Sequence, residues 1–138
     1  LIPQTGQKTL LKTRKFFPNN LLSRNREAIE DIIVLINKNP LLARAGVSFG
    51  WLSSALYSCY KTTLNPVFLK TIKPPVMILV GSDDKLVSIN AIKKNIGFLM
   101  NGQLICFNNA RHELYIELPK VVEQMESCIV GFVTKSCE

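Results

Sequence analysis

The only histidine of the chain, His112, and an aspartate, Asp84, occupy positions that suit acid–base chemistry. The aspartate ends the sequence G-S-D-D, which directly follows an apolar run, and the histidine comes shortly after a second apolar run. A carboxylate that accepts the Nδ1–H of a histidine fixes the tautomer of the ring, and Nε2 can then take a proton from a hydroxyl nucleophile. Asp84 is the preferred partner of His112 because it lies past the tight turn, as the fourth residue of G-x-x-D, and Asp83 is the alternative. Such a pair serves to activate a nucleophile.

The nucleophile for this pair is less evident. Residues 46–50 read G-V-S-F-G, a literal G-x-S-x-G, and Ser48, Asp84 and His112 follow one another in the order of an α/β-type triad. A nucleophile elbow requires a buried strand before the serine, but the preceding L-L-A-R-A is short, follows a proline and contains an arginine. Ser48 is therefore the less favoured nucleophile. We expect the two glycines to be turn and helix-start residues, with Ser48 or the nearby backbone forming a helix cap.

Two strand–helix units after Lys73 are predicted to position the pair. Residues 76–80 form a continuous apolar run between two prolines and a glycine, which is typical of a strand covered on both faces. Ser88 can cap a helix whose apolar residues continue to Leu99, and the Asn-Gly sequence that follows stops this helix. Residues 104–107 form the second strand.

The order of these elements predicts their arrangement in space. Two strands joined by a helix lie side by side and parallel, with a right-handed crossover. A last, amphipathic helix begins at Leu118. Because active sites in open parallel sheets lie beyond the carboxyl ends of the strands, we expect Asp84 and His112 at one edge of the sheet. Two parallel strands alone leave bare edges, so we expect the sheet to continue in residues absent from this chain or in another chain.

The first half of the chain is predicted to be helical. Ser23 can cap a helix with an apolar stripe that starts at Ile29, and Asn39-Pro40 ends it. A second helix fades at two threonines, and Asn65-Pro66 opens a short third turn. Neither long helix is apolar all round, so each must cover another surface. The apolar side of the second helix consists of Trp51, Leu52, Ala55, Leu56 and Cys59.

Length and composition limit the classes of protein. The 138 residues, 47% of them apolar, predict one globular domain or part of a larger one. No apolar stretch approaches the about 20 residues of a membrane span. We interpret the start at Leu1, without a secretory signal, as a truncation or an unusual start. The net charge of +7 includes a basic leader, which either solubilises the terminus or attracts anionic lipid or nucleic acid. Its basic residues are Lys8, Lys12, Arg14 and Lys15.

The four cysteines, Cys59, Cys106, Cys128 and Cys137, show no C-x-x-C spacing. One histidine cannot complete a zinc site with them, so we expect no metal. Cys106 lies in an apolar strand run and Cys128 on an apolar helix stripe, and both are expected to be buried free thiols. This cysteine usage favours a reducing cytoplasm.

The second half of the chain resembles the closing part of an α/β-hydrolase, in residues 74–87 and 110–133. The resemblance is to the branch of lysophospholipases and monoacylglycerol lipases, which includes serine-aminopeptidase-like hydrolases. It implies that Asp84 is the triad acid and His112 the triad base. Residues 22–26 and 46–52 resemble the helical cap of bacterial members, where the G-x-S-x-G stretch does not align with the elbow. The implied fold class is α/β, with a helical cap or lid segment and basic leader in residues 1–72 and a βαβα part of the hydrolase core in residues 73–138.

The resemblance also implies a function. The chain is expected to be the C-terminal fragment of a serine hydrolase of carboxylic esters, with lysophospholipids or monoacylglycerols as substrates. The family's oxyanion loop and nucleophile strand come before the cap, so we expect this chain to be inactive alone. The alternatives are a half-protein that complements a separate N-terminal half, or a non-catalytic remnant, and nucleic-acid binding by the leader is a third class. No cofactor is implied, and the expected location is the cytoplasm, either free or peripheral to a membrane.

Overall fold

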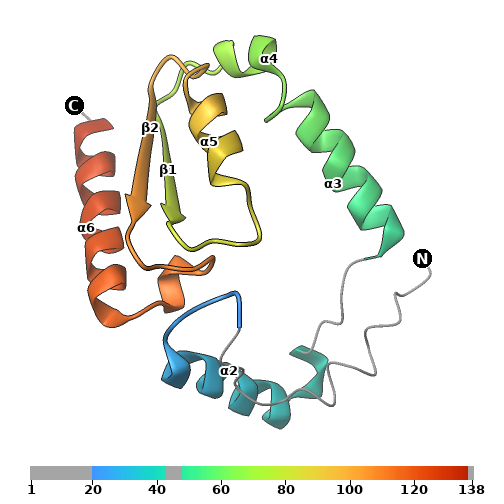
Figure 1. Ribbon diagram of the computed structural model, residues 1–138, viewed down its shortest axis with the longest axis vertical. Coiled ribbons are helices and arrows are strands. Elements are labelled where there is room, and N and C mark those ends of the chain that lie inside the picture. Colours follow the sequence, from blue (N-terminus) through green and yellow to red (C-terminus); the bar gives the residue numbers. More distant parts are fainter. Residues whose placement is uncertain (1–19, 43–47, 137–138) are drawn as a thin grey trace.

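The computed structural model describes residues 20–42 and 48–136, so the basic leader, Cys137 and the first half of the G-x-S-x-G stretch lie outside the described part. Helices precede a strand–helix–strand–helix arrangement (Figure 1). In chain order the elements are α2 (Arg26–Lys38), the 3-10 turn η1 (Pro40–Leu42), α3 (Phe49–Lys61), α4 (Pro66–Lys70), β1 (Val76–Gly81), α5 (Ile89–Ile96), β2 (Gly102–Phe107), the 3-10 turn η2 (Leu114–Ile116) and α6 (Pro119–Ser136).

The two strands form a parallel pair, as the order of the elements predicts. Their register runs from Val76 opposite Gly102 to Gly81 opposite Phe107. Helix α5 makes the crossover between them, and β1 and β2 are the only strands within the described ranges. Because both strands end at the same edge of the sheet, the loops that follow them begin next to each other.

Helix α5 is shorter than the sequence predicts. It begins after Ser88, whose side chain accepts the N–H of Ala91 as expected of a cap, but it ends at Ile96 rather than near Leu99. Gly97 follows, and two turns then lead into β2, which begins at Gly102. The prediction was wrong here because glycine lowers helix stability by about 1 kcal/mol, and the apolar Leu99 does not compensate for this from a turn.

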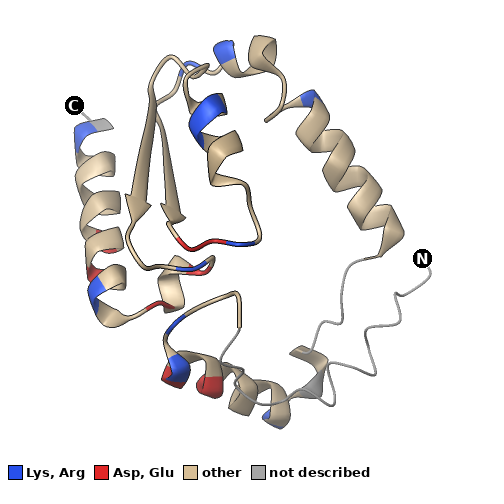
Figure 2. Cartoon of the chain, viewed as in Figure 1, with Lys and Arg blue, Asp and Glu red and all other residues tan. Residues whose placement is uncertain are grey.

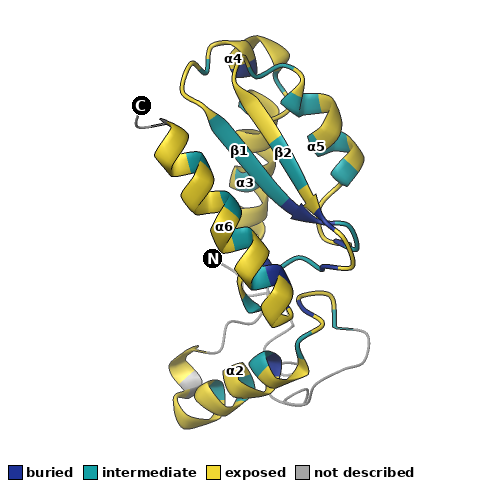
Figure 3. Cartoon of the chain, turned by 90° about the vertical axis from the view of Figure 1, so that its left-hand side faces the viewer, coloured by how far each residue is buried: buried dark blue, intermediate teal, exposed yellow. Residues whose placement is uncertain are grey.

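The buried core lies where the end of β2 meets the start of α6. Its buried members are Phe107, Ala110, Leu114 and Val121, with half-buried residues of β1, β2 and α6 packed against them. Figure 3 shows the buried residues concentrated around this end of the strands. The prediction of two buried thiols is wrong for Cys106, which is exposed, and Cys128 packs against the core but is only partly buried. Side chains alternate along a strand, so Cys106 lies on the opposite face from Phe107.

The helices of the first half bury little of their apolar surface within the described chain. Helix α2 buries Ile29, and α3 buries no residue at all. The aromatic residues of α3, among them Trp51 at 59% exposed, face outward, and Figure 1 shows this helix well separated from the strands. Within the described ranges, no helix is both long enough and apolar enough to cross a membrane.

Candidate active site

Asp84 is held in the turn after β1 by hydrogen bonds to the backbone of that turn. Asp84 donates its N–H to the carbonyl of Gly81 at 3.2 Å, and its Oδ1 accepts the N–H groups of Leu86 at 2.7 Å and Val87 at 3.1 Å. An aspartate side chain that accepts N–H groups further along the chain is a standard means of closing such a turn. The turn therefore occupies Oδ1 of the carboxylate, and Oδ2 is available to accept a hydrogen bond from another residue.

The loop after β2 is joined to this turn by backbone hydrogen bonds. Ser82 donates its N–H to the carbonyl of Phe107 and Asp83 to that of Ala110, both at 2.9 Å. In return, Asn109 donates its N–H to Oγ of Ser82 at 2.9 Å. Asn109 has a φ of 58°, a left-handed conformation that asparagine tolerates better than most residues. The two loops thus form one unit beyond the carboxyl edge of the sheet.

The structure brings Asp84 and His112 together within this unit. Oδ2 of Asp84 lies 2.8 Å from Nδ1 of His112, and the two side chains are 3% and 32% exposed. Asp83, the alternative acid, instead forms an ion pair with Arg24. An ionised carboxylate can only accept, so Nδ1 of His112 carries the proton and Nε2 is the nitrogen available for proton transfer.

The surroundings favour the ionised form of Asp84. Burial raises the pKa of this carboxyl, but hydrogen bonds from His112 and from the N–H groups of Leu86 and Val87 lower it, and the pKa lies below its usual 3.8. A group whose pKa falls on folding stabilises the fold above its unfolded pKa, and this stabilisation is lost as the pH falls through the folded value. Asp84 is therefore a charged acceptor for His112 at neutral pH.

Gly81 lets the two loops approach this closely. A Cβ atom on Gly81 would lie 2.3 Å from the carbonyl oxygens of both Ala110 and Arg111, which are backbone atoms. Only a residue without a side chain can occupy this position unless the loop that carries His112 moves away.

We expect Gly81→Ala to lower the free energy of unfolding by about 1–3 kcal/mol, because backbone must shift to admit the methyl group. The measurement is unfolding of the chain by urea. The matched control is Gly131→Ala in α6, where a Cβ atom would meet no atom within 4 Å. This second substitution should leave stability unchanged or raise it by up to about 1 kcal/mol, since alanine favours a helix. Equal stability of the two variants would contradict the close approach at Gly81.

Ser48 lies at the start of α3 and caps it. Its Oγ accepts the N–H of Trp51 at 3.1 Å, so the prediction of a helix cap is confirmed. Figure 1 shows the start of α3 far from the loops that follow β1 and β2. No side-chain hydroxyl or thiol in residues 20–42 and 48–136 is hydrogen-bonded to His112. The structure thus brings together two of the three predicted site residues and leaves Ser48 apart.

Two buried polar residues near the pair were not identified as site residues from the sequence. Glu117 is 1% exposed, and Ser23 is fully buried. Ser23 was predicted to cap α2, which is wrong, because Asn25 caps that helix by accepting the N–H of Ala28. Ser23 instead donates its hydroxyl to the carbonyl of Ile116 at 2.7 Å. The sequence signal for Glu117 is its place, together with His112, in the stretch that resembles the histidine loop of the hydrolases.

Charged residues of both signs surround the pair. Figure 2 shows them in the loops after β1 and β2 and at the start of α2, whereas α3 carries few. In the described part of the chain, no three side chains of the metal-binding types His, Cys, Asp and Glu come together as a metal site requires.

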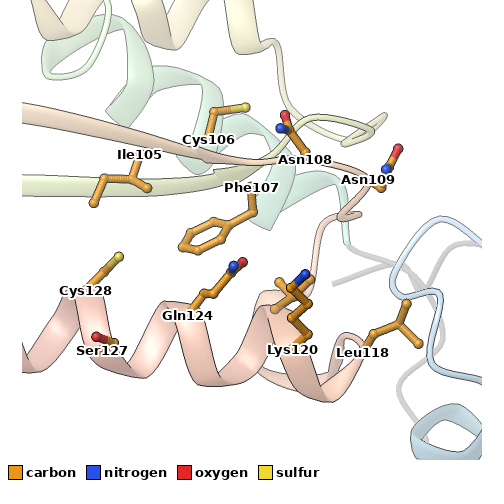
Figure 4. A pocket seen from close by; sticks show the side chains of 11 residues that line it. Ile105, Cys106, Phe107, Asn108, Asn109, Leu118, Lys120, Gln124, Ser127 and Cys128 are labelled. Carbon is orange, nitrogen blue, oxygen red and sulfur yellow. The ribbon is translucent and has the colours of Figure 1, made fainter.

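A groove of about 760 Å³ lies between β2 and α6. Figure 4 shows Phe107 on one side of this groove and Gln124 and Cys128 on the other. Neither Asp84 nor His112 lines it. The groove is therefore lined by a different set of residues from the candidate acid–base pair.

Comparisons with known proteins identify the fold. No protein-family model and no curated protein matches the sequence. Among solved structures, a soluble variant of monoglyceride lipase from Saccharomyces cerevisiae, in complex with a substrate analog, is 17% identical with a TM-score of 0.62, and the match covers 88% of this chain and 42% of that one. The monoacylglycerol lipase of Paleococcus ferrophilus is 21% identical with a TM-score of 0.65, over 97% of this chain and 54% of the lipase.

The chain therefore spans about half the length of these lipases. Its helices followed by a parallel β-α-β-α unit correspond to the C-terminal part of an α/β-hydrolase fold, and the predicted fold class is confirmed.

Proposed function

We propose that this chain supplies the acid and the base of a catalytic triad, Asp84 and His112, to a serine hydrolase of carboxylic esters. The observation that carries the proposal is the 2.8 Å contact between Oδ2 of Asp84 and Nδ1 of His112, made beyond the carboxyl ends of two parallel strands. In the reaction, Nε2 of His112 takes the proton of the serine as the serine attacks the ester carbonyl, and later returns it to the leaving alcohol. The carboxylate of Asp84 orients the imidazole and stabilises the imidazolium.

We infer that the substrates are monoacyl esters of glycerol, such as monoacylglycerols or lysophospholipids. The inference is supported by the two lipases that share the fold, since their names specify monoglyceride or monoacylglycerol esters. The exposed apolar side of α3, with Trp51, Leu52 and Leu56, offers a surface for an acyl chain. In this proposal residues 1–72 act as the cap or lid and residues 73–138 as part of the catalytic core.

The serine nucleophile would come from a polypeptide half that precedes the cap. Ser48 is engaged as a helix cap, and Figure 1 shows the start of α3 far from the loop that follows β2. The β1–β2 pair is consistent with such a half, because within residues 20–42 and 48–136 the sheet has two strands, and a further strand can join its edges. The second candidate function is that of a non-catalytic remnant. This chain would then have the same structure, but no N-terminal half would supply a serine.

The experiment compares the chain alone with the chain joined to the polypeptide encoded directly upstream of Leu1. We expect the chain alone to show no hydrolysis of monoacylglycerol or lysophospholipid above background, and the joined protein to hydrolyse one of them. Ser48→Ala should leave the rate of the joined protein unchanged and cost about 1 kcal/mol of stability through loss of the cap. Turnover by the isolated chain that disappears in Ser48→Ala would refute the proposal. An upstream sequence without a serine elbow would favour the remnant.

A further inference from the structure

The side chain of Glu117 is buried and hydrogen-bonded to the loop that carries His112. The oxygens of Glu117 accept three backbone N–H groups. Oε1 accepts those of Arg111 at 2.8 Å and Arg24 at 3.1 Å, and Oε2 accepts that of Leu118 at 3.1 Å. Since Arg111 directly precedes His112, the carboxylate holds the Ala110–Arg111 peptide unit, one residue before the histidine, and, at the same time, a segment from the first half of the chain.

That segment, residues 20–25, runs along the histidine loop and is fastened to it at several points. The backbone N–H of Glu113 donates to the carbonyl of Leu22 at 2.8 Å. The guanidinium of Arg111 donates to the carbonyls of Asn20 and Ser23. The buried hydroxyl of Ser23 donates to Ile116 at 2.7 Å.

The same segment also reaches the acid turn. Arg24 forms an ion pair with Asp83, the neighbour of Asp84, while its backbone N–H is bound by Glu117. Residues 20–25 therefore contact both loops of the candidate site, and Glu117 lies where the segment and the histidine loop meet.

Hydrogen bonds must offset the cost of burying the Glu117 carboxylate. A carboxylate removed from water is costly unless it is hydrogen-bonded, and hydrogen bonds from N–H groups to a charged acceptor are about twice as strong as neutral ones. Loss of this side chain would leave three N–H groups without their acceptor. One of them belongs to the residue whose placement sets the position of the histidine.

We propose that Glu117 is a positioning residue for the Asp84–His112 pair. It acts through the backbone of Arg111 and Arg24, and it fixes the histidine loop against the acid turn so that Nδ1 of His112 stays within reach of Asp84. The catalytic meaning rests on the proposed function, but the positioning itself can be measured without substrate or nucleophile.

The test is nuclear magnetic resonance on the full chain. Because His112 is the only histidine, the ring nitrogens and the Nδ1-bound proton give unambiguous signals. Glu117→Ala should abolish the low-field Nδ1 proton signal and raise the pKa of Asp84 toward its usual value, since the hydrogen bond from His112 is lost. Glu117→Gln should weaken the signal, because its amide oxygen can still accept from Arg111 but its NH₂ group cannot accept from Leu118. Glu126→Gln, at an exposed site on α6, is the matched control and should match the wild type.

Two results would overturn the proposal. The first is a Glu117→Ala chain that keeps the near-ultraviolet circular dichroism of the wild type together with the Nδ1 proton signal and the Asp84 pKa. The second result matters if the Glu117→Ala chain does not fold. In that case, a Glu117→Gln chain with the same Nδ1 proton signal and Asp84 pKa as the wild type would overturn the proposal. A failure of ester hydrolysis leaves these signals untouched, so the positioning role and the proposed function fail separately.

Discussion

Replacement of His112 by alanine is expected to lower the rate of ester hydrolysis by the joined protein about 10⁶-fold. Without the imidazole, no group accepts the proton of the serine, and a triad that loses its base loses nearly the whole advantage of the triad. Hydrolysis measured under saturating substrate gives kcat directly. Added imidazole should restore part of the rate if the fold is intact, because a free imidazole can enter the space left by the side chain. If the variant retains more than about 1% of the wild-type kcat, His112 is not the base. The decrease in kcat would then be far smaller than the decrease caused by removal of a triad residue.

Asp84→Asn is expected to reduce kcat about 10⁴-fold, less than loss of the histidine. The amide keeps the shape of the side chain but presents no negative charge to the imidazolium, and it permits the unproductive tautomer of His112. The neighbouring Asp83→Asn is a matched control, because Asp83 pairs with Arg24 instead of the histidine. We expect less than a tenfold effect from it, since exposed ion pairs contribute only about 0–1 kcal/mol. Equal losses in the two variants would show that the acid has been misassigned.

The pairing of Asp84 with His112 could be predicted from the sequence because topology dictates it. Each residue follows a strand, and a right-handed crossover makes those strands parallel neighbours, so the two residues reach the same edge although they lie far apart in sequence. The caps Ser48 and Ser88 were predictable for a different reason. A cap depends on the side chain and on N–H groups two or three residues further on, so the information is local.

The contacts that support the pair could not be predicted, because they are not local. Glu117 binds the N–H of Arg24, 93 positions away in sequence, and neither residue type signals this contact. Ser23 has the sequence of a cap, but a buried carbonyl of Ile116 takes its hydroxyl, and Asn25 takes over the capping. Tertiary structure decides between two partners of similar strength here, and a single sequence does not contain that choice.

The central claim is that Asp84 and His112 activate a serine that the described part of this chain does not contain. The most direct measurement is labelling of the joined protein with a fluorophosphonate, which reacts with activated serines, followed by mass spectrometry to locate the labelled residue. We predict one labelled serine upstream of Leu1, and no labelling of the His112→Ala variant. Labelling of Ser48, or labelling that persists without His112, would contradict the account.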